Sequence, residues 1–307
     1  MDRIRYNTFS HYLQQRYGER VWKIPVDAGF TCPNRDGHRG RGGCIFCRID
    51  SFSKMESRYD VTVRRQIEAA LERHRKNGIK KYIVYFQAST NTYAPVPLLR
   101  TLFEQSLQYD GVVGLSIATR PDCLSEEVVE LLRELAGRTD LWVELGLQST
   151  HEETLQRINR GHTYTNYLSA VAALSTLPLR ICCHLMLGLP GEGPDHILQT
   201  ALRIAPSPIH EVKLHPMLVL QETELEKMYA GGEYQPLTLA SYVDQLVLFL
   251  EQLPAHMVIQ RVTAEAPAAM LLAPAWAGRK SVVLQTLQRT MQERDTWQGR
   301  LFQSTIS

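Results

Sequence analysis

Residues 21–47 read VWKIPVDAGFTCPNRDGHRGRGGCIFC. The first six, Val21–Val26, are rich in β-branched and aromatic residues and predict a strand. The stretch that follows places Cys32, Cys44 and Cys47 in one loop, with the spacing Cys-x11-Cys-x2-Cys. Clustered cysteine thiolates bind iron–sulfur clusters or zinc, so this loop predicts a metal site at the carboxyl end of the first strand.

The ligands of this loop leave three interpretations open. Three cysteines are one too few to bind every iron of a [4Fe-4S] cluster, and the free iron would bind S-adenosylmethionine (SAM). His38 lies between Cys32 and Cys44, and three cysteines with one histidine make a tetrahedral zinc set. The third interpretation is unliganded thiols that pack as small apolar groups.

Strand-like runs alternate with amphipathic helical runs along the rest of the chain. Six more strands are predicted at Lys81–Phe86, Val112–Ala118, Leu141–Leu145, Arg180–Leu187, Glu211–Leu214 and Val258–Val262. Helices are predicted at Val61–Lys76, Pro97–Leu107, Ser125–Ala136, Glu152–Ile158 and Asn166–Leu174. This alternation predicts an α/β fold of parallel strands, as a partial or complete (β/α) barrel, with an open doubly wound sheet as the alternative.

The chain divides into two parts by composition. Residues 1–263 form the expected barrel, including the basic amino-terminal segment and the cysteine loop. Residues 264–307 begin with the sequence AEAPAAMLLAPAWAGRK, continue as a helix to about Arg294 and end in a polar tail. We expect this second part to be a carboxy-terminal extension that packs on the barrel.

Charge and hydropathy give expectations about the protein's cellular compartment and its binding partners. The net charge is +2, but residues 1–58 contain 11 Lys/Arg and 6 Asp/Glu, a net of +5, which leaves −3 for the remainder. Such a basic segment either binds a polyanion or is a solvated surface. The start MDRIRYNTF has no apolar signal region and no apolar run is long enough to span a membrane, so we expect a cytoplasmic protein.

Six motifs together resemble the radical SAM superfamily, and within it the YhcC/YtqA-type proteins. They are CPNRDGHRGRGGCIFC, YFQASTNTY, TRPDC, ELGLQSTHEETLQRINRGH, HLMLGLPGE and KLHP. These proteins are related to the radical SAM part of the Elongator catalytic subunit. The resemblance implies a radical SAM barrel, an enzyme that cleaves SAM reductively to a 5′-deoxyadenosyl radical, and a [4Fe-4S] cluster on Cys32, Cys44 and Cys47.

The resemblance also implies residues that contact SAM. Gln148 matches a glutamine that contacts SAM, Arg160 matches an arginine that binds its carboxylate, and His184 takes the position of an aspartate that contacts it. The superfamily's GGE motif is absent; either Gln87 or backbone carbonyls near it are expected to bind the SAM amino group instead. In Arg120-Pro121-Asp122, the proline is expected to fix the turn after the third strand, and Arg120 and Asp122 are candidates to reach SAM or substrate.

Two of these positions, Arg160 and His184, also have plain structural interpretations, and two further residues, Glu144 and Cys123, have a structural and a functional one. Without the resemblance, Arg160 is a surface arginine at a helix end and His184 is a hydrogen-bonded core histidine. Glu144 lies within a predicted strand on the same face as Trp142, so it needs a buried partner. Cys123 lies near the expected barrel mouth, where its thiol either donates a hydrogen atom to a substrate radical or is simply buried.

The nearest relatives implied by the resemblance act on wobble uridines of tRNA. We therefore expect conversion of a carboxymethylaminomethyl side chain to aminomethyl, with the basic residues 1–58 against tRNA phosphates. An electron donor such as flavodoxin or ferredoxin is implied. The alternatives are a small-molecule or peptide substrate and, from another class, a zinc-stabilised nucleic-acid-binding protein without catalysis.

Overall fold

The computed structural model describes residues 5–48, 51 and 62–303. Part of the basic segment 1–58 and the first residue of the helix predicted at Val61–Lys76 therefore lie outside the described residues. Among the described residues, no helix combines the length and the apolar composition that crossing a membrane requires.

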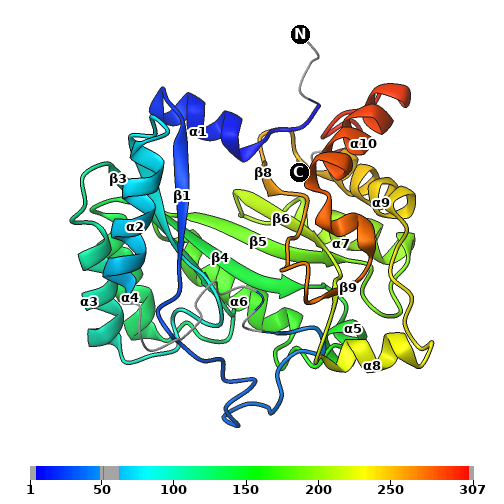
Figure 1. The fold of residues 1–307 in the computed structure, drawn as a ribbon, viewed down its shortest axis with the longest axis horizontal. Coiled ribbons are helices and arrows are strands. Elements are labelled where there is room, and N and C mark those ends of the chain that lie inside the picture. The colour runs from blue at the N-terminus through cyan, green and yellow to red at the C-terminus, as the bar shows by residue number, and fades with distance from the viewer. Residues whose placement is uncertain (1–4, 49–50, 52–61, 304–307) are drawn as a thin grey trace.

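Seven parallel strands form one curled sheet with helices on its outer side (Figure 1). The strands are β1 (Val21–Val26), β2 (Lys81–Phe86), β3 (Val112–Thr119), β4 (Asp140–Gln148), β5 (Arg180–Leu187), β6 (Glu211–Pro216) and β8 (Val258–Arg261). Their order in the sheet follows their order in the chain, without the reversal that defines a doubly wound sheet. The predicted half-barrel is confirmed, and the open doubly wound alternative is wrong.

Helices cover the outer face of this half-barrel. They are α2 (Val63–Arg75), α3 (Val96–Ser106), α4 (Glu126–Ala136), α6 (Tyr164–Ser175), α7 (Pro194–Ile204) and α9 (Leu239–Gln252). The short helix α5 (Glu152–Arg157) instead buries Leu155 in a second apolar cluster, which also contains Ile45 of the cysteine loop. Alternate strand residues such as Val84, Val143 and Cys183 point outward into the apolar core beneath the covering helices. The intervening residues point into the barrel, where the polar side chains of the site lie.

The amino-terminal helix α1 (Phe9–Tyr17), which the sequence analysis did not predict, lies at the amino ends of the strands. Phe9 and Leu13 pack against Ile83 and Trp142, which point into the barrel. Thr8, the residue that caps this helix, pairs with Ile259 of β8. The helix therefore fills one end of the half-barrel and leaves the carboxyl ends of the strands for the chemistry.

The carboxy-terminal residues share the barrel's core. Strand β9 (Leu271–Ala273) pairs antiparallel with β7 (Val219–Leu220), and the short helix η2 (Ala275–Gly278) follows. Helix α10 (Lys280–Glu293) buries Val283, Leu287 and Met291 in the main core. The remaining helix, α8 (Glu224–Ala230), lies near the cysteine loop, because Leu225 N donates to Ile45 O at 2.9 Å.

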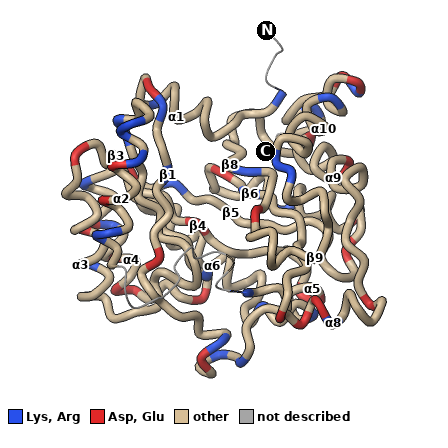
Figure 2. Tube along the Cα trace, viewed as in Figure 1, with Lys and Arg blue, Asp and Glu red and all other residues tan. Residues whose placement is uncertain are grey.

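Much of the positive charge of the amino-terminal segment is paired within the molecule. Arg16 binds Asp140, Lys23 binds Glu144, and Arg39 binds Asp122 at 3.2 Å. Figure 2 shows basic and acidic positions interspersed along the chain. The net charge of residues 1–58 therefore overstates the positive surface that this segment offers to a polyanion.

Candidate functional site

A single buried carboxylate organises the middle of the barrel. Glu144 on β4 accepts hydrogen bonds from Ser116 Oγ at 2.6 Å and His184 Nε2 at 2.7 Å, and it forms ion pairs with Lys23 and Lys213. Burial raises the pKa of Glu144, but the charges of Lys213 and Lys23 and the hydrogen bond from His184 outweigh it. The pKa of this carboxyl therefore lies well below its ordinary value.

A second polar layer lies between this carboxylate and α1. Glu211 on β6 accepts from Trp142 Nε1 at 2.9 Å and Arg180 Nε at 2.6 Å, and also from Gln260. Gln260 Oε1 in turn accepts from Lys23 Nζ at 3.1 Å and so connects the two layers. Nearly every charge inside the barrel has a partner of opposite sign, which is the condition for burying it.

One pocket at the carboxyl ends of the strands contains all eight residues predicted to bind the cluster or SAM. They are Cys32, Cys44, Cys47, Gln87, Arg120, Gln148, Arg160 and His184. Cys123 lines a different cavity, together with His38, Arg39 and Tyr93. Burial raises the pKa of the Cys123 thiol to about 12, so it is protonated, but it does not face the pocket in which a substrate radical would form.

The three cysteine sulfurs are not gathered as closely as the ligands of a single zinc ion would be. A tetrahedral zinc ion holds its sulfur ligands about 3.8 Å apart, given its usual bond length. In the described part of the chain, the group of three ligand atoms that approach within 4.8 Å of one another is Glu144, Cys182 and His184. The cysteine sulfurs form no such group, and three irons of one cluster require wider spacing because each thiolate binds a different iron.

The position of His38 also argues against the zinc interpretation. It lines the cavity that contains Cys123 and lies 6.1 Å from the Tyr93 ring, so the three-cysteine, one-histidine set is not assembled. The compact group around Glu144 is not a metal site either, because two lysines already neutralise that carboxylate. Burial and, to a smaller extent, the neighbouring Cys44 raise the pKa of the Cys47 thiol to about 11. The thiol is therefore protonated, and a metal that binds there must displace its proton.

Hydrogen bonds connect the cysteine loop to the segment between α5 and α6. Asn34 Nδ2 donates to Asn159 O at 2.6 Å and lies 3.8 Å from Cys44 Sγ. Asn159 Nδ2 donates to Gly43 O at 2.7 Å, and Ile45 N donates to Ile158 O at 3.1 Å. These contacts fix Cys44 against the barrel before any metal binds.

Gly161→Ala should loosen this attachment. Gly161 has a φ of +72°, and a Cβ there would overlap Asn34 Oδ1 and lie 2.9 Å from Asn34 Cγ. We expect a loss of about 2–3 kcal/mol in unfolding free energy and a reduced iron content after reconstitution. The matched control is Gly78→Ala, where φ is +75° but a Cβ meets nothing within 4 Å; it should lose about 1 kcal/mol and keep its iron. Equal iron content in the two variants would contradict the assigned contact.

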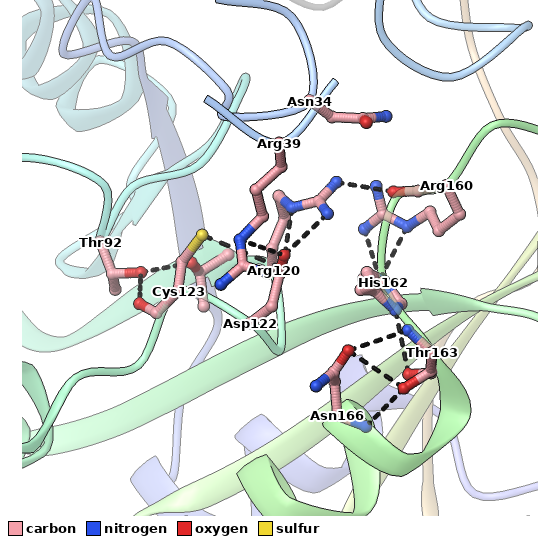
Figure 3. Close-up of polar contacts among 12 residues, drawn as sticks. Asn34, Arg39, Thr92, Arg120, Asp122, Cys123, Arg160, His162, Thr163 and Asn166 are labelled. Carbon is pink, nitrogen blue, oxygen red and sulfur yellow. Dashed lines mark hydrogen bonds and ion pairs between the residues drawn. The ribbon is translucent and has the colours of Figure 1, made fainter. Parts of the chain in front are cut away.

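Arg120 has a structural role that the sequence left open (Figure 3). Its guanidinium binds Asp122 through two hydrogen bonds of 2.9 and 3.0 Å and donates a third, of 2.9 Å, to Arg160 O. Asp122 also pairs with Arg39 of the cysteine loop. Arg120 therefore connects the end of β3 to the loop and to Arg160, in addition to lining the pocket.

Arg160 is buried, so it is not a surface residue at a helix end. Its guanidinium donates to Gly146 O and, through Nη1, to Cys44 Sγ at 3.5 Å. His162 Nε2 lies 3.1 Å from the same carbonyl (Figure 3). The neighbouring Gln148 has a φ of +80° at an irregularity in the pairing of β4 with β5, which turns the chain at the pocket.

The loop that replaces the GGE motif is strained. Ala88 and Ser89 have φ values of 67° and 58°, a conformation that costs non-glycine residues about 1–3 kcal/mol each and that concentrates at functional sites. Ser89 Oγ, Thr90 Oγ1 and Asn91 Oδ1 are buried and have no hydrogen-bond partner among the described residues. Ser89 and Thr90 line the pocket, so their hydroxyl oxygens could accept from a donor bound there.

Two histidines of the site should make stability fall in acid. Burial, reinforced by Arg160, lowers the pKa of His162 to about 3, and burial with Lys213 lowers that of His184 to about 4. The unfolded chain binds these protons near pH 6.5, so both groups contribute their full stability above pH 6.5 and lose it as the pH falls toward 4. Unfolding free energy measured in guanidinium chloride should decline by a few kcal/mol over this range.

His162→Gln tests this acid sensitivity, because glutamine keeps a donor but does not titrate. We expect a shallower dependence of unfolding free energy on pH in the variant. The matched control is His11→Gln on the exposed side of α1. A variant slope identical to that of the unsubstituted protein would show that His162 does not contribute.

Two models of known protein families together match most of the chain. The model described as the radical SAM superfamily matches residues 34–204, and that described as the radical SAM C-terminal domain matches residues 209–293. YtqA of Bacillus subtilis is 40% identical over 300 residues, which are 97% of this chain and 93% of that protein. YhcC of Escherichia coli is 36% identical over 288 residues, 94% and 92% of the two chains.

Two more distant proteins share part of the sequence or the fold. The tRNA uridine(34) acetyltransferase of Methanocaldococcus jannaschii is 31% identical over 164 residues, 52% of this chain and 30% of that protein. The solved structure of the archaeal Methanocaldococcus infernus Elp3 superposes with a TM-score of 0.70 at 20% identity, over 91% of this chain. The present chain spans 64% of that structure, and the likeness concerns the fold alone.

Proposed function

Because the chain belongs to the radical SAM superfamily, we propose that it is an enzyme that modifies the side chain of a wobble uridine in tRNA. Proteins of this family bind a [4Fe-4S] cluster and SAM. We base the choice of substrate on the similarity over 164 residues to a tRNA uridine(34) acetyltransferase. The conversion we propose is that of a carboxymethylaminomethyl group to an aminomethyl group.

The pocket offers residues for both parts of the cofactor. Cys32, Cys44 and Cys47 would hold three irons, and SAM would bind at the fourth. Bound together, cluster and SAM supply a 5′-deoxyadenosyl radical, which can take hydrogen from an unactivated carbon. Gln148 and Arg160 line the pocket beside these cysteines and would hold the methionine end of SAM, with Arg160 suited to a carboxylate.

The net reaction balances without an added oxidant. SAM, the carboxymethylaminomethyl side chain and water give methionine, 5′-deoxyadenosine, the aminomethyl side chain, glyoxylate and one proton. Oxidation of the substrate's secondary amine to an imine releases two electrons, which SAM would accept overall, and water hydrolyses the imine to the aminomethyl group and glyoxylate. An outside donor such as flavodoxin or ferredoxin would then serve to prime the cluster.

The interior of the barrel would keep the reacting groups in place. Glu144 and its two lysines fix the floor of the pocket, and α1 fills the opposite end of the half-barrel. An RNA base would enter from the carboxyl ends of the strands after it is turned out of its stack. Because many amino-terminal cations are internally paired, charge adds little to the choice of tRNA.

The test uses the reconstituted, reduced holoenzyme with an anticodon stem-loop RNA that contains 5-carboxymethylaminomethyluridine. We expect the RNA to stimulate 5′-deoxyadenosine formation by about tenfold or more, with one glyoxylate released per modified nucleoside. Nucleoside mass spectrometry should show the aminomethyl product in equal amount. SAM cleavage that the RNA does not stimulate, with no change in the nucleoside, would refute the tRNA substrate.

A further inference from the structure

Two cationic side chains and two histidines lie together on one wall of the pocket, formed by β5, β6 and β8. They are His184, Lys213, His215 and Arg261. The cluster and SAM residues discussed above come instead from the cysteine loop and from β2 to β4 and the segments that follow those strands, His184 excepted. This basic wall, as we call these four residues, therefore extends beyond the part of the pocket that the cofactors need.

Two polar atoms of the basic wall are buried without a partner. His215 Nε2 and Arg261 Nε make no hydrogen bond within the described residues. Buried polar atoms in folded proteins are nearly always bonded, so two on one pocket wall indicate a group that binds there. The ring of His215 lies 5.8 Å from that of His184, which places both imidazoles beside the same space.

The charge of the basic wall is only partly neutralised. Glu144 is shared between Lys23 and Lys213, so one carboxylate faces two ammonium groups, and Lys213 Nζ also lies 3.2 Å from Tyr85 Oη. Arg261 has a loose partner in Glu265, with an Nη2–Oε1 distance of 3.7 Å, and Lys280 lies at the same distance from that carboxylate. The wall therefore retains positive charge that favours an anion.

We propose that the basic wall binds the carboxylate at the end of the substrate's side chain, an inference that rests on the proposed function. Lys213 is 8% exposed in its side chain and lies inside the barrel, so its partner must be a group that extends into the pocket, as the end of a base's side chain does, rather than a backbone phosphate at the surface. Arg261 is more exposed, at 35%, and meets the group from the rim. The carboxylate then holds the adjacent methylene carbon in the pocket beside the cysteines.

The experiment compares the binding of two anticodon stem-loops to the holoenzyme by fluorescence anisotropy. One contains 5-carboxymethylaminomethyluridine, and the other contains 5-methylaminomethyluridine, which lacks the carboxylate. We expect the unsubstituted enzyme to bind the first at least about tenfold more tightly. Arg261→Gln should reduce this preference to about twofold or less, and Arg261→Lys should retain an intermediate preference.

Arg289→Gln is the matched control, because it makes the same substitution on the exposed face of α10 and should leave the preference unchanged. Equal binding of the two RNAs by the unsubstituted enzyme, or a full preference in Arg261→Gln, would overturn the inference. RNA-stimulated SAM cleavage decides the proposed function separately. A carboxylate preference that Arg261→Gln removes, without such cleavage, would support the basic wall and refute the reaction.

Discussion

Cys44→Ser should abolish the cluster and, with it, SAM cleavage. Cys44 is the cysteine that the structure holds most firmly, because Asn34 and Arg160 both approach its sulfur and Gly43 is bound by Asn159. Without this ligand, two cysteines of the loop remain, too few to retain a cluster with one open iron. We expect the iron content to fall to background and 5′-deoxyadenosine formation to fall by roughly 10²-fold or more.

Cys123→Ser is the matched control for this experiment. It removes a thiol close to the cysteine loop but in the neighbouring cavity, so the iron content should stay at that of the unsubstituted protein. Metal analysis and electron paramagnetic resonance of the reduced proteins measure the outcome. A Cys44→Ser protein with a full complement of iron would contradict the ligand assignment, and one zinc per chain in the unsubstituted protein would restore the zinc interpretation.

The strands were predictable because each carries its apolar residues on the side that meets the helices. Val21–Val26, Lys81–Phe86 and Arg180–Leu187 begin and end at the predicted residues. β4 extends beyond the prediction to Gln148, because the final residues adopt their conformation from the pocket rather than from local preference. β7 and β9, of two and three residues, are too short for any alternation to reveal them.

Four helices, α1, α7, α8 and α9, were not predicted from the sequence, and for two of them, α1 and α9, the breadth of the apolar face gives the reason. Helix α1 buries only Leu13 completely, so its apolar face is too narrow to give a clear period. Helix α9, in contrast, buries residues on most of its surface, because α7 and α10 cover it from both sides. A helix that is apolar nearly all round loses the period that an isolated amphipathic helix shows.

That the residues assigned to the cluster or SAM share one pocket was predictable from the sequence, but their contacts were not. The motifs brought the cysteines, Gln148, Arg160 and His184 to one face, since all follow or lie in parallel strands. The contact of Arg160 with Cys44 depends on a loop packing that no local pattern encodes. The basic wall had a readable signal, because Lys213 and His215 alternate with buried apolar residues in a strand, where charged side chains are rare.

Glu144→Gln should strongly destabilise the barrel. Glutamine preserves the size of the side chain but removes the charge that neutralises Lys23 and Lys213, both inside the barrel. Removing one partner of a buried ion pair typically costs about 3–5 kcal/mol, because the remaining charge is left uncompensated. Guanidinium chloride unfolding should show this loss at pH 7, where the depressed pKa of Glu144 keeps the native carboxylate ionised.

The double variant Glu144→Gln, Lys23→Met separates uncompensated charge from lost packing. If charge is the cause, removing one of the two lysines restores part of the stability that Glu144→Gln loses, because a single ammonium group remains to be solvated. Glu134→Gln is the control for a carboxylate in an exposed ion pair, here with Arg100, and should cost less than about 1 kcal/mol. A loss of similar size in Glu134→Gln and Glu144→Gln would show that the buried carboxylate does not hold the barrel together.

The stabilisation by Glu144 should also depend on pH. Because the pKa of Glu144 is depressed in the folded protein, its contribution to stability is complete above the pKa of the unfolded chain and is lost as the pH falls through the folded pKa. The unsubstituted and Glu144→Gln proteins should therefore converge in unfolding free energy in acid.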